Sequence, residues 1–175
     1  MENSLPHDIS IRPIRESDLP AFKAIRLEAL REHPESFGSD YAENLREPES
    51  FWVARIKDAV DSSEGCIILA DAGNELAGLA GVRREKGVKG RHAAMIWGVY
   101  VRPKYRGQKL ADRIIAELLT WCRSNQVRIV RLSATCTGPA VRCYLRCGFA
   151  VYGVSPEEIR IGDKYYDETL MWRRV

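Results

Sequence analysis

The residues with the clearest chemical potential lie between Val99 and Ala111, where the sequence reads VYVRPKYRGQKLA. An apolar run over 93–101 ends in a basic turn, and Gly107 follows that turn. Apolar residues then recur every four positions, which is typical of one face of a helix: Leu110, Ile114, Leu118 and Cys122. The pattern predicts a strand, a glycine turn and a helix N-terminus, in that order.

A helix that begins in this way points unpaired backbone N–H groups at one spot, where the helix dipole also favours an anion. Basic residues crowd the same stretch, against the single acidic residue Asp112: Arg102, Lys104, Arg106, Lys109 and Arg113. We interpret the stretch as a site for a pyrophosphate-sized anion, held by backbone amides and assisted by basic side chains. A solvated basic cap on an ordinary helix is the alternative that these residues leave open.

Apolar runs elsewhere predict the strands that would position this turn. An edge strand is expected at Ile9 and Ile11, and further strands at 66–71, 75–84, 91–101, 128–134, 150–154 and 165–174. Gly78 and Gly81 lie inside one of these strands, which predicts a bulge or a close backbone contact there.

Helices are expected from Ser17 or Asp18 to His33, and over 51–60, 107–124 and 139–146. The segment 36–48 is interpreted as a polar linker, and a polar loop is expected between the last two strands. Because a single helix connects the strands at 91–101 and 128–134, these two strands should pair in parallel.

Composition narrows the class of protein. With 175 residues, 45% of them hydrophobic and 29% charged, the chain is expected to form one globular domain over 1–175. The net charge of +3 is too small to indicate a nucleic-acid or membrane partner. The start, MENSLPHDIS, lacks the regions of a secretory signal, and the run at 93–101 is shorter than the roughly 18 residues of a membrane helix.

The five cysteines have irregular spacing, which does not suggest a disulfide framework and favours a reducing cytoplasm. Cys143 and Cys147 lie four residues apart, but no second ligand pair accompanies them. No metal is therefore expected.

The segment RGQKLA at 106–111, preceded by VYVRP, resembles the acetyl-CoA signature of the GNAT acetyltransferases, Gln/Arg-x-x-Gly-x-Gly/Ala. Arg106 fills its first position and Ala111 its last, whereas Lys109 stands where the family has its inner glycine. We expect the Lys109 side chain to point to solvent or to the phosphates, leaving its backbone N–H available. The resemblance implies acetyl-CoA as cosubstrate, without a metal, and these cofactor-binding residues: Val99, Tyr100, Val101, Arg106, Gly107, Gln108, Lys109, Leu110, Ala111 and Thr137.

A second segment, AVRCYLRCGF at 140–149, matches the family pattern Ala-x-x-x-Tyr-x-x-x-Gly-Phe. By this resemblance Tyr144 is the catalytic residue that protonates the departing CoA thiolate; a tyrosine that only packs against the sheet is the alternative. Thr137 stands at the family's Asn position and can still cap a helix.

The resemblance implies the GNAT fold, of the α/β (α+β) class. Its mixed, mostly antiparallel sheet has six or seven strands and helices on both faces. The central parallel strands, here 91–101 and 128–134, splay apart so that the pantetheine arm lies between them.

The chemistry needs a neutral amine, a donor to the thioester oxygen such as the N–H of Val99 or Val101, and a proton for the thiolate. The strand before the signature carries no carboxylate, and His92 at its start is better explained as a surface residue. Three glutamates, Glu28, Glu32 and Glu35, could face the acceptor, but ordinary helix charges explain them equally well, so no base is assigned. Near the C-terminus, Tyr165, Tyr166 and Asp167 could contact the acceptor or be ordinary strand residues.

The sequence therefore predicts an N-acetyltransferase of the GNAT subgroup with small-molecule or unknown acceptors. It would transfer acetyl to a small-molecule or peptide primary amine by direct attack, since no cysteine has a recognisable base for a covalent route. A catalytically weak acyl-CoA sensor or scaffold is the main alternative, and a nucleic-acid binder lacks a recognition motif. A homodimer is left open.

Overall fold

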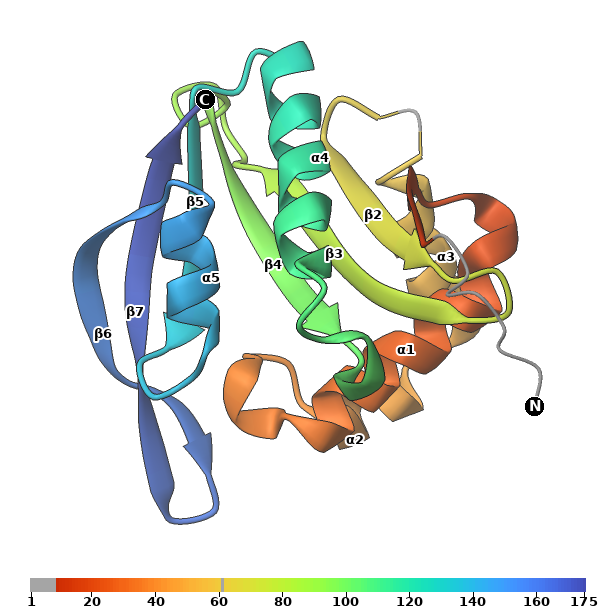
Figure 1. Cartoon of the computed structure of the whole chain (residues 1–175), viewed down its shortest axis with the longest axis horizontal. Coiled ribbons are helices and arrows are strands. Elements are labelled where there is room, and N and C mark those ends of the chain that lie inside the picture. Colours follow the sequence, from red (N-terminus) through yellow and green to blue (C-terminus); the bar gives the residue numbers. More distant parts are fainter. Residues whose placement is uncertain (1–8, 61) are drawn as a thin grey trace.

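A seven-stranded mixed sheet, in the order β1-β2-β3-β4-β5-β7-β6, forms the frame of the protein (Figure 1). The computed structural model describes residues 9–60 and 62–175. The strands are β1 (Ser10–Pro13), β2 (Gly65–Asp71), β3 (Leu76–Arg84), β4 (Ala93–Val101), β5 (Ile129–Thr135), β6 (Ala150–Ile161) and β7 (Lys164–Arg174). Every neighbouring pair is antiparallel except β4 and β5, which confirms the predicted mixed sheet.

Helices cover both faces of the sheet, as predicted. The helices are α1 (Leu19–Glu32), α2 (Tyr41–Arg46), α3 (Glu49–Lys57), α4 (Leu110–Ser124) and α5 (Ala140–Arg146). α4 and α5 lie on one face, while α1 and α3 lie on the other (Figure 1). Each face has its own core, and α4 buries the predicted apolar stripe: Leu110, Ile114, Ile115, Leu118, Leu119 and Cys122. Burial of this stripe fixes where α4 begins relative to β4.

β4 and β5 separate soon after they pair. Their parallel register covers only Ala93–Met95 against Ile129–Arg131. Beyond these residues β4 continues beside β3, and β5 pairs with β7 over its whole length. Beyond Met95, the edge of β4 that faces β5 therefore has no strand partner among the described residues, which confirms the predicted splay.

A bulge interrupts β4 at the position where it leaves β5. The register passes from Gly81 opposite Trp97 to Leu79 opposite Tyr100, so two residues of β4 face one of β3. One of the two is Gly98, whose φ of +67° lies in the left-handed region that favours glycine. The extra residue changes which side chains of β4 face α4, from the even-numbered ones to the odd-numbered ones.

The close contact predicted at Gly81 is confirmed. A Cβ atom at this position would lie 2.3 Å from two ring carbons of Trp97. Glycine therefore allows the indole to lie across β3 on the α1 face.

The prediction that 36–48 is a linker is wrong, because α2 lies within it. The Asp40 side chain accepts a hydrogen bond of 2.9 Å from the Glu43 N–H and thereby caps the helix. Asn44 is the buried residue of α2, and Leu45 is exposed. Without an apolar face, a six-residue helix leaves no periodic signal.

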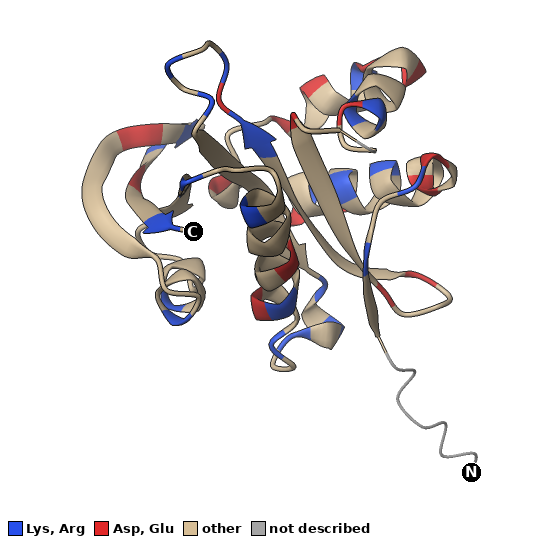
Figure 2. Ribbon diagram, turned by 90° about the horizontal axis from the view of Figure 1, so that it is seen from above, with Lys and Arg blue, Asp and Glu red and all other residues tan. Residues whose placement is uncertain are grey.

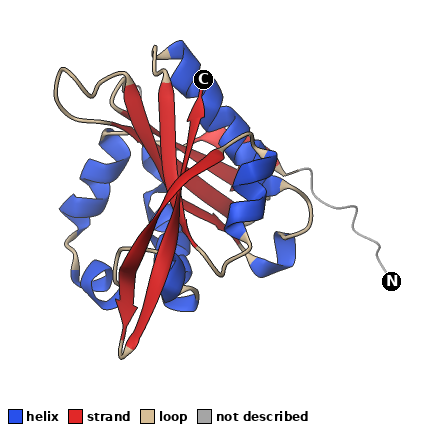
Figure 3. Ribbon diagram, turned by 90° about the vertical axis from the view of Figure 1, so that its left-hand side faces the viewer, coloured by secondary structure: helices blue, strands red, loops and turns tan. Residues whose placement is uncertain are grey.

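The polar loop expected before residue 165 is also wrong. β6 continues to Ile161, and the turn at Gly162 leads directly into β7. The two strands form a long twisted hairpin that extends beyond the other strands (Figure 3). Its register shifts between Ser155 and Ile159, where Glu157 has a φ of +52°. Because of this bulge, and because solvent contacts both faces of the hairpin, the sequence shows no regular alternation of apolar and polar residues here.

Candidate active site

The N-terminus of α4 carries unpaired backbone donors. Its first intrahelical hydrogen bond runs from the Arg113 N–H to the Lys109 carbonyl, at 3.1 Å. The amides of Lys109, Leu110, Ala111 and Asp112 therefore have no acceptor within the helix. The Leu110 side chain is buried and anchors this end of α4 in the core. The geometry suits an anion bound to backbone N–H groups.

Two left-handed residues turn the chain into α4. Gly107 has a φ of +82° with open space around it, and Lys109 has a φ of +55°. Lys109 therefore adopts the conformation that glycine favours, although it carries a side chain. That side chain is exposed to solvent, as was expected.

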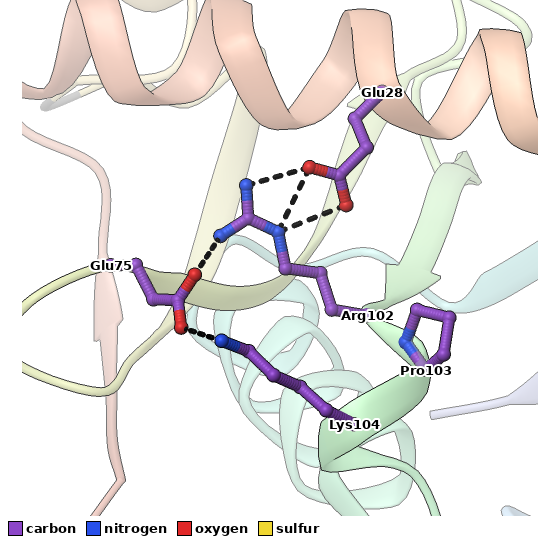
Figure 4. Close-up of a pocket in the computed structure, with 5 residues that line it drawn as sticks. All are labelled: Glu28, Glu75, Arg102, Pro103 and Lys104. Carbon is purple, nitrogen blue, oxygen red and sulfur yellow. Dashed lines mark hydrogen bonds and ion pairs between the residues drawn. The ribbon is translucent and has the colours of Figure 1, made fainter.

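Arg102 and Lys104 are neutralised by carboxylates on other elements (Figure 4). Arg102 donates to Glu28 on α1 through Nε and Nη2, and to Glu75 through Nη1 at 2.7 Å. Lys104 forms an ion pair with Glu75, and the Tyr100 hydroxyl donates to Glu28 at 3.0 Å. Burial raises the pKa of Glu28, but the hydrogen bonds from Arg102 and Tyr100 outweigh it and hold that pKa below its usual value. The network ties the end of β4 to α1.

Arg106 and Arg113 also form hydrogen bonds with other parts of the chain. Arg106 donates to the Val101 carbonyl at 2.9 Å, and its Nη2 lies 2.9 Å from Nε2 of His33. Arg113 donates to the Ile9 carbonyl. Most of these basic side chains therefore have partners from distant parts of the chain. That basic side chains assist a bound anion stays a prediction. Among the described residues, ion pairs form at two of the five basic residues, Arg102 and Lys104. Lys109 has neither an ion pair nor a side-chain hydrogen bond with a described residue.

We expect Glu28→Gln to destabilise the protein by about 1–2 kcal/mol at pH 7, since charged hydrogen bonds to a partly buried group are lost. The pKa of Glu28 is lower in the folded protein, so its contribution exists above the unfolded pKa of 4.5 and disappears as pH falls through the folded value. Urea unfolding at pH 7 and pH 3 should therefore show a difference that shrinks in acid. Glu32→Gln, one turn later on α1, is the control, because its pair with Arg31 is exposed and should change stability little. An equal loss of stability at both pH values would contradict the assignment.

We expect Lys109→Gly to stabilise the protein by about 0.5–1 kcal/mol, because relief of left-handed strain exceeds the added entropy of the unfolded chain. CoA should bind as well as before or better, since the backbone N–H is kept. Gln126, at the other end of α4, has a φ of +60°. Gln126→Gly is therefore a matched control for stability that leaves the anion site unchanged. A loss of CoA affinity above about tenfold, or 1.4 kcal/mol, would instead show that the lysine ammonium is a ligand.

Tyr144 is the buried residue of α5 and points into the core, with 5% of its surface exposed. Its ring centre is 6.2 Å from that of Phe149, and no described residue accepts a hydrogen bond from its hydroxyl. Burial raises the pKa of the Tyr144 phenol, and the charges of nearby groups, including Glu168, act in the same direction. The phenol is therefore protonated at neutral pH and retains its donor proton.

Thr137 does not cap α5. It is exposed in the preceding turn, while Pro139 occupies the N-cap position and no side chain caps the helix. The expectation of a threonine cap is wrong, because the helix begins three residues after Thr137.

The β4 residues Val99, Tyr100 and Val101 differ in where their side chains lie. Val99 and Val101 pack against the α4 core, whereas Tyr100 is buried on the α1 face. None of these three side chains places a polar group at the unpaired edge of β4. The groups that this edge presents to a bound molecule are therefore its backbone N–H and C=O groups. Gln108 and Ala111 lie in the turn and the first helical residues, where backbone N–H groups are again the available donors.

The glutamates considered from the sequence are engaged elsewhere: Glu28 with Arg102, Glu32 with Arg31, and Glu35 near His33. His92 is exposed just before β4, at the end opposite to the bulge.

Sequence reasoning missed Glu168, which lies opposite Thr135 where β5 ends. The Thr135 hydroxyl donates to the Glu35 carbonyl at 2.5 Å, so this cross-strand pair faces the α1 side. Glu168 forms no ion pair with a described residue. The sequence alone does not show which residues lie opposite a charged strand residue, because this depends on the register of the sheet.

The structure also brings Asp112 to the two cysteines of α5. The ligand atoms of Asp112, Cys143 and Cys147 all lie within 4.8 Å of one another, and Arg146 pairs with Asp112 at 3.1 Å. A third ligand for the two thiols could not be inferred from the sequence, because Asp112 lies on another helix. Arg146 already neutralises this carboxylate.

The C-terminal hairpin residues have structural contacts. Asp167 accepts a hydrogen bond of 2.8 Å from the Glu157 N–H, which holds the bulge of β6. Tyr165 is exposed beneath Arg160.

The distribution of charge and the length of the helices are relevant to nucleic-acid and membrane partners. Basic and acidic residues are interspersed over the elements and do not separate onto two faces (Figure 2). Among residues 9–60 and 62–175, no helix has the length and apolarity needed to cross a bilayer.

Comparisons with known proteins agree with this geometry. The model of the acetyltransferase (GNAT) family matches residues 22–149. No match is found among curated proteins.

Solved structures of the same fold cover almost the whole chain. An acetyltransferase of the GNAT family from Streptococcus pneumoniae is 18% identical, with a TM-score of 0.85 over 96% of this chain and 100% of that chain. A putative acetyltransferase from Salmonella typhimurium, solved with its cofactor acetyl-CoA, is 18% identical, with a TM-score of 0.82 over 95% and 94%. A phosphinothricin acetyltransferase from Sinorhizobium meliloti in complex with acetyl-CoA is 17% identical, with a TM-score of 0.78 over 95% and 88%. Because the family model spans most of the chain and the splayed sheet matches these folds, the protein belongs to the GNAT family of acetyltransferases.

Proposed function

We propose that the protein transfers the acetyl group of acetyl-CoA to the nitrogen of a small-molecule or peptide amine in the cytoplasm, by direct attack in a ternary complex. The observation that carries this proposal is the separation of β4 from β5 beside the unpaired N-terminus of α4. Amides at the start of α4 would hold the pyrophosphate of acetyl-CoA, and the unpaired edge of β4 would accept hydrogen bonds from, and donate them to, the pantetheine amides.

The backbone beyond the Gly98 bulge would serve the reacting carbonyl. The N–H of Val99 or Val101 donates to the thioester oxygen as negative charge develops on it. A rigid backbone donor needs no reorganisation during the reaction, which makes it effective in a site closed to water.

The acceptor must attack as a neutral amine. Deprotonating an alkylammonium with a pKa near 10.4 costs about 4–5 kcal/mol at pH 7, so a base or a water molecule must take the proton. Glu168 faces the α1 side without an ion-pair partner among the described residues, and we assign it this role. Tyr144, on the other side, donates its phenolic proton to the departing thiolate.

The test is release of free CoA thiol from acetyl-CoA in the presence of a panel of amines, with mass spectrometry of the acetylated product. Turnover of at least one amine, above the rate of thioester hydrolysis, supports the proposal. The alternative of a sensor or scaffold is favoured by Lys109 in place of the signature glycine. Acetyl-CoA binding without turnover of any amine would support that alternative and overturn the enzymatic proposal.

A further inference from the structure

Two arginines on the α1 face lie beside the bulge of β4, and neither has a carboxylate partner within the part of the chain that the structure describes. Arg26, on α1, is 4% exposed, and its Nε and Nη1 atoms have no hydrogen-bond partner among the described residues. Arg55, on α3, is partly buried, and its Nη1 is also buried without a partner. Burial and the charge of Arg55 lower the pKa of Arg26 to about 10, which still leaves it protonated at neutral pH. The fold therefore holds a buried positive charge that nothing in the described chain hydrogen-bonds.

Aromatic rings line this pair. The Arg26 guanidinium lies 4.9 Å from the ring centre of Phe37 and 5.9 Å from that of Trp97. Arg55 lies 4.8 Å from Phe51 and 5.3 Å from the same Trp97. Contacts with ring faces compensate a desolvated cation only in part, and they satisfy none of its N–H donors. A buried guanidinium of this kind is stabilised by an anion that accepts its hydrogen bonds.

The location of the pair connects it to the reacting position. A methyl group added at Gly98 would lie 3.3 Å from Nη1 of Arg26, so the guanidinium rests against the bulge. The next residue is Val99, whose N–H is one of the proposed donors to the thioester oxygen. Burial and the positive charge of Arg83 lower the pKa of Arg55, whereas the negative charge of Glu47 raises it. Among residues 9–60 and 62–175, no acidic group offsets the charge of Arg26 in this way.

We propose that Arg26 and Arg55 form a subsite for a carboxylate of the acceptor, so that the acceptor is a small amine with a carboxylate close to its nitrogen, as in an amino acid. This rests on the proposed function for the position of the amine. The anion would enter from the unpaired edge of β4 and accept hydrogen bonds from the free guanidinium nitrogens. The ammonium end of such an acceptor would lie toward Glu168, so the two ends of a zwitterion meet opposite charges.

Matched product analogues test the subsite without turnover. N-acetylglycine and N-acetylglycinamide, together with the same pairs built on larger amino acids, are titrated calorimetrically into the CoA-bound protein. They differ in the carboxylate alone. We expect at least one carboxylate to bind ten times more tightly than its amide, and we expect this preference to fall below threefold in Arg26→Met and in Arg55→Met. Lys23→Met, which removes a positive charge one turn earlier on α1, should keep the preference.

Thermal unfolding separates this role from a structural one. Without ligand, Arg26→Met should raise the melting temperature by a few degrees, because an unpaired buried charge is replaced by an apolar side chain of similar length. A structural arginine would give the opposite sign. The proposal is overturned if no carboxylate is preferred over its amide, or if the preference survives in both arginine variants. Failure of the proposed function is distinct: no amine is turned over, while the preference for carboxylates and its loss in Arg26→Met remain.

Discussion

Replacement of Gly107 by proline is expected to weaken CoA binding by about 100-fold or more, which corresponds to about 2.7 kcal/mol. Gly107 has a φ of +82°, and proline is restricted to values near −65°, so the turn into α4 must change its path. The substitution also removes one N–H from the donors that converge before α4. Since a hydrogen bond to a charged group contributes about 1.5–3 kcal/mol, a misdirected turn that loses two of them accounts for the expected effect. Calorimetric titration with CoA measures it.

Two controls separate the anion site from general strain. Gly87 has a φ of +84° in the turn between β3 and β4, at the opposite end of β4, so Gly87→Pro introduces the same backbone conflict away from the site. Gly107→Ala keeps the N–H, and its Cβ meets no atom within 4 Å. It should cost stability of about 1 kcal/mol and affect CoA affinity much less than proline does. Unchanged affinity in a folded Gly107→Pro protein would count against the loop assignment.

The parts of the fold that local patterns specify were predictable. The stripe of α4 has a period of four residues, and the parallel pairing of β4 with β5 follows from a single connecting helix. The bulge at Gly98 is also visible in retrospect, because the buried side chains facing α4 change from Ile96 to Val99. A bulge adds one residue to a period of two, so such a break is its sequence signature.

The partners of charged residues could not be predicted. The basic run before α4 suggested basic side chains that assist a bound anion, but Arg102 hydrogen-bonds Glu28, 74 residues away, and Arg113 hydrogen-bonds Ile9, 104 residues away. Which carboxylate neutralises which guanidinium depends on tertiary contacts that leave no local pattern. Arg26 was hidden for the same reason: its position on the apolar side of α1 is ordinary, and its lack of a partner appears only when the neighbouring elements are placed.

Tyr144→Phe is expected to lower kcat by about 100-fold while leaving the fold and CoA affinity nearly unchanged. The phenylalanine ring can keep the contact with Phe149, and no described residue loses a hydrogen bond when the hydroxyl is removed. What disappears is the proton that the phenol donates to the departing thiolate. Because burial raises the pKa of Tyr144, the phenol acts as a donor that stays protonated across the working pH range. Steady-state thiol release, with CoA affinity measured separately, gives both quantities.

The choice of thioester distinguishes the proton donor from a packing residue. An acetyl thioester of a more acidic thiol needs less help from a proton donor, so the difference between wild type and Tyr144→Phe should shrink with such a donor. A packing defect would lower the rate equally for every thioester. Tyr152→Phe is the matched control, because this tyrosine is exposed on β6 and should retain wild-type turnover. Wild-type kcat in Tyr144→Phe would mean that water protonates the thiolate and that Tyr144 serves the core alone.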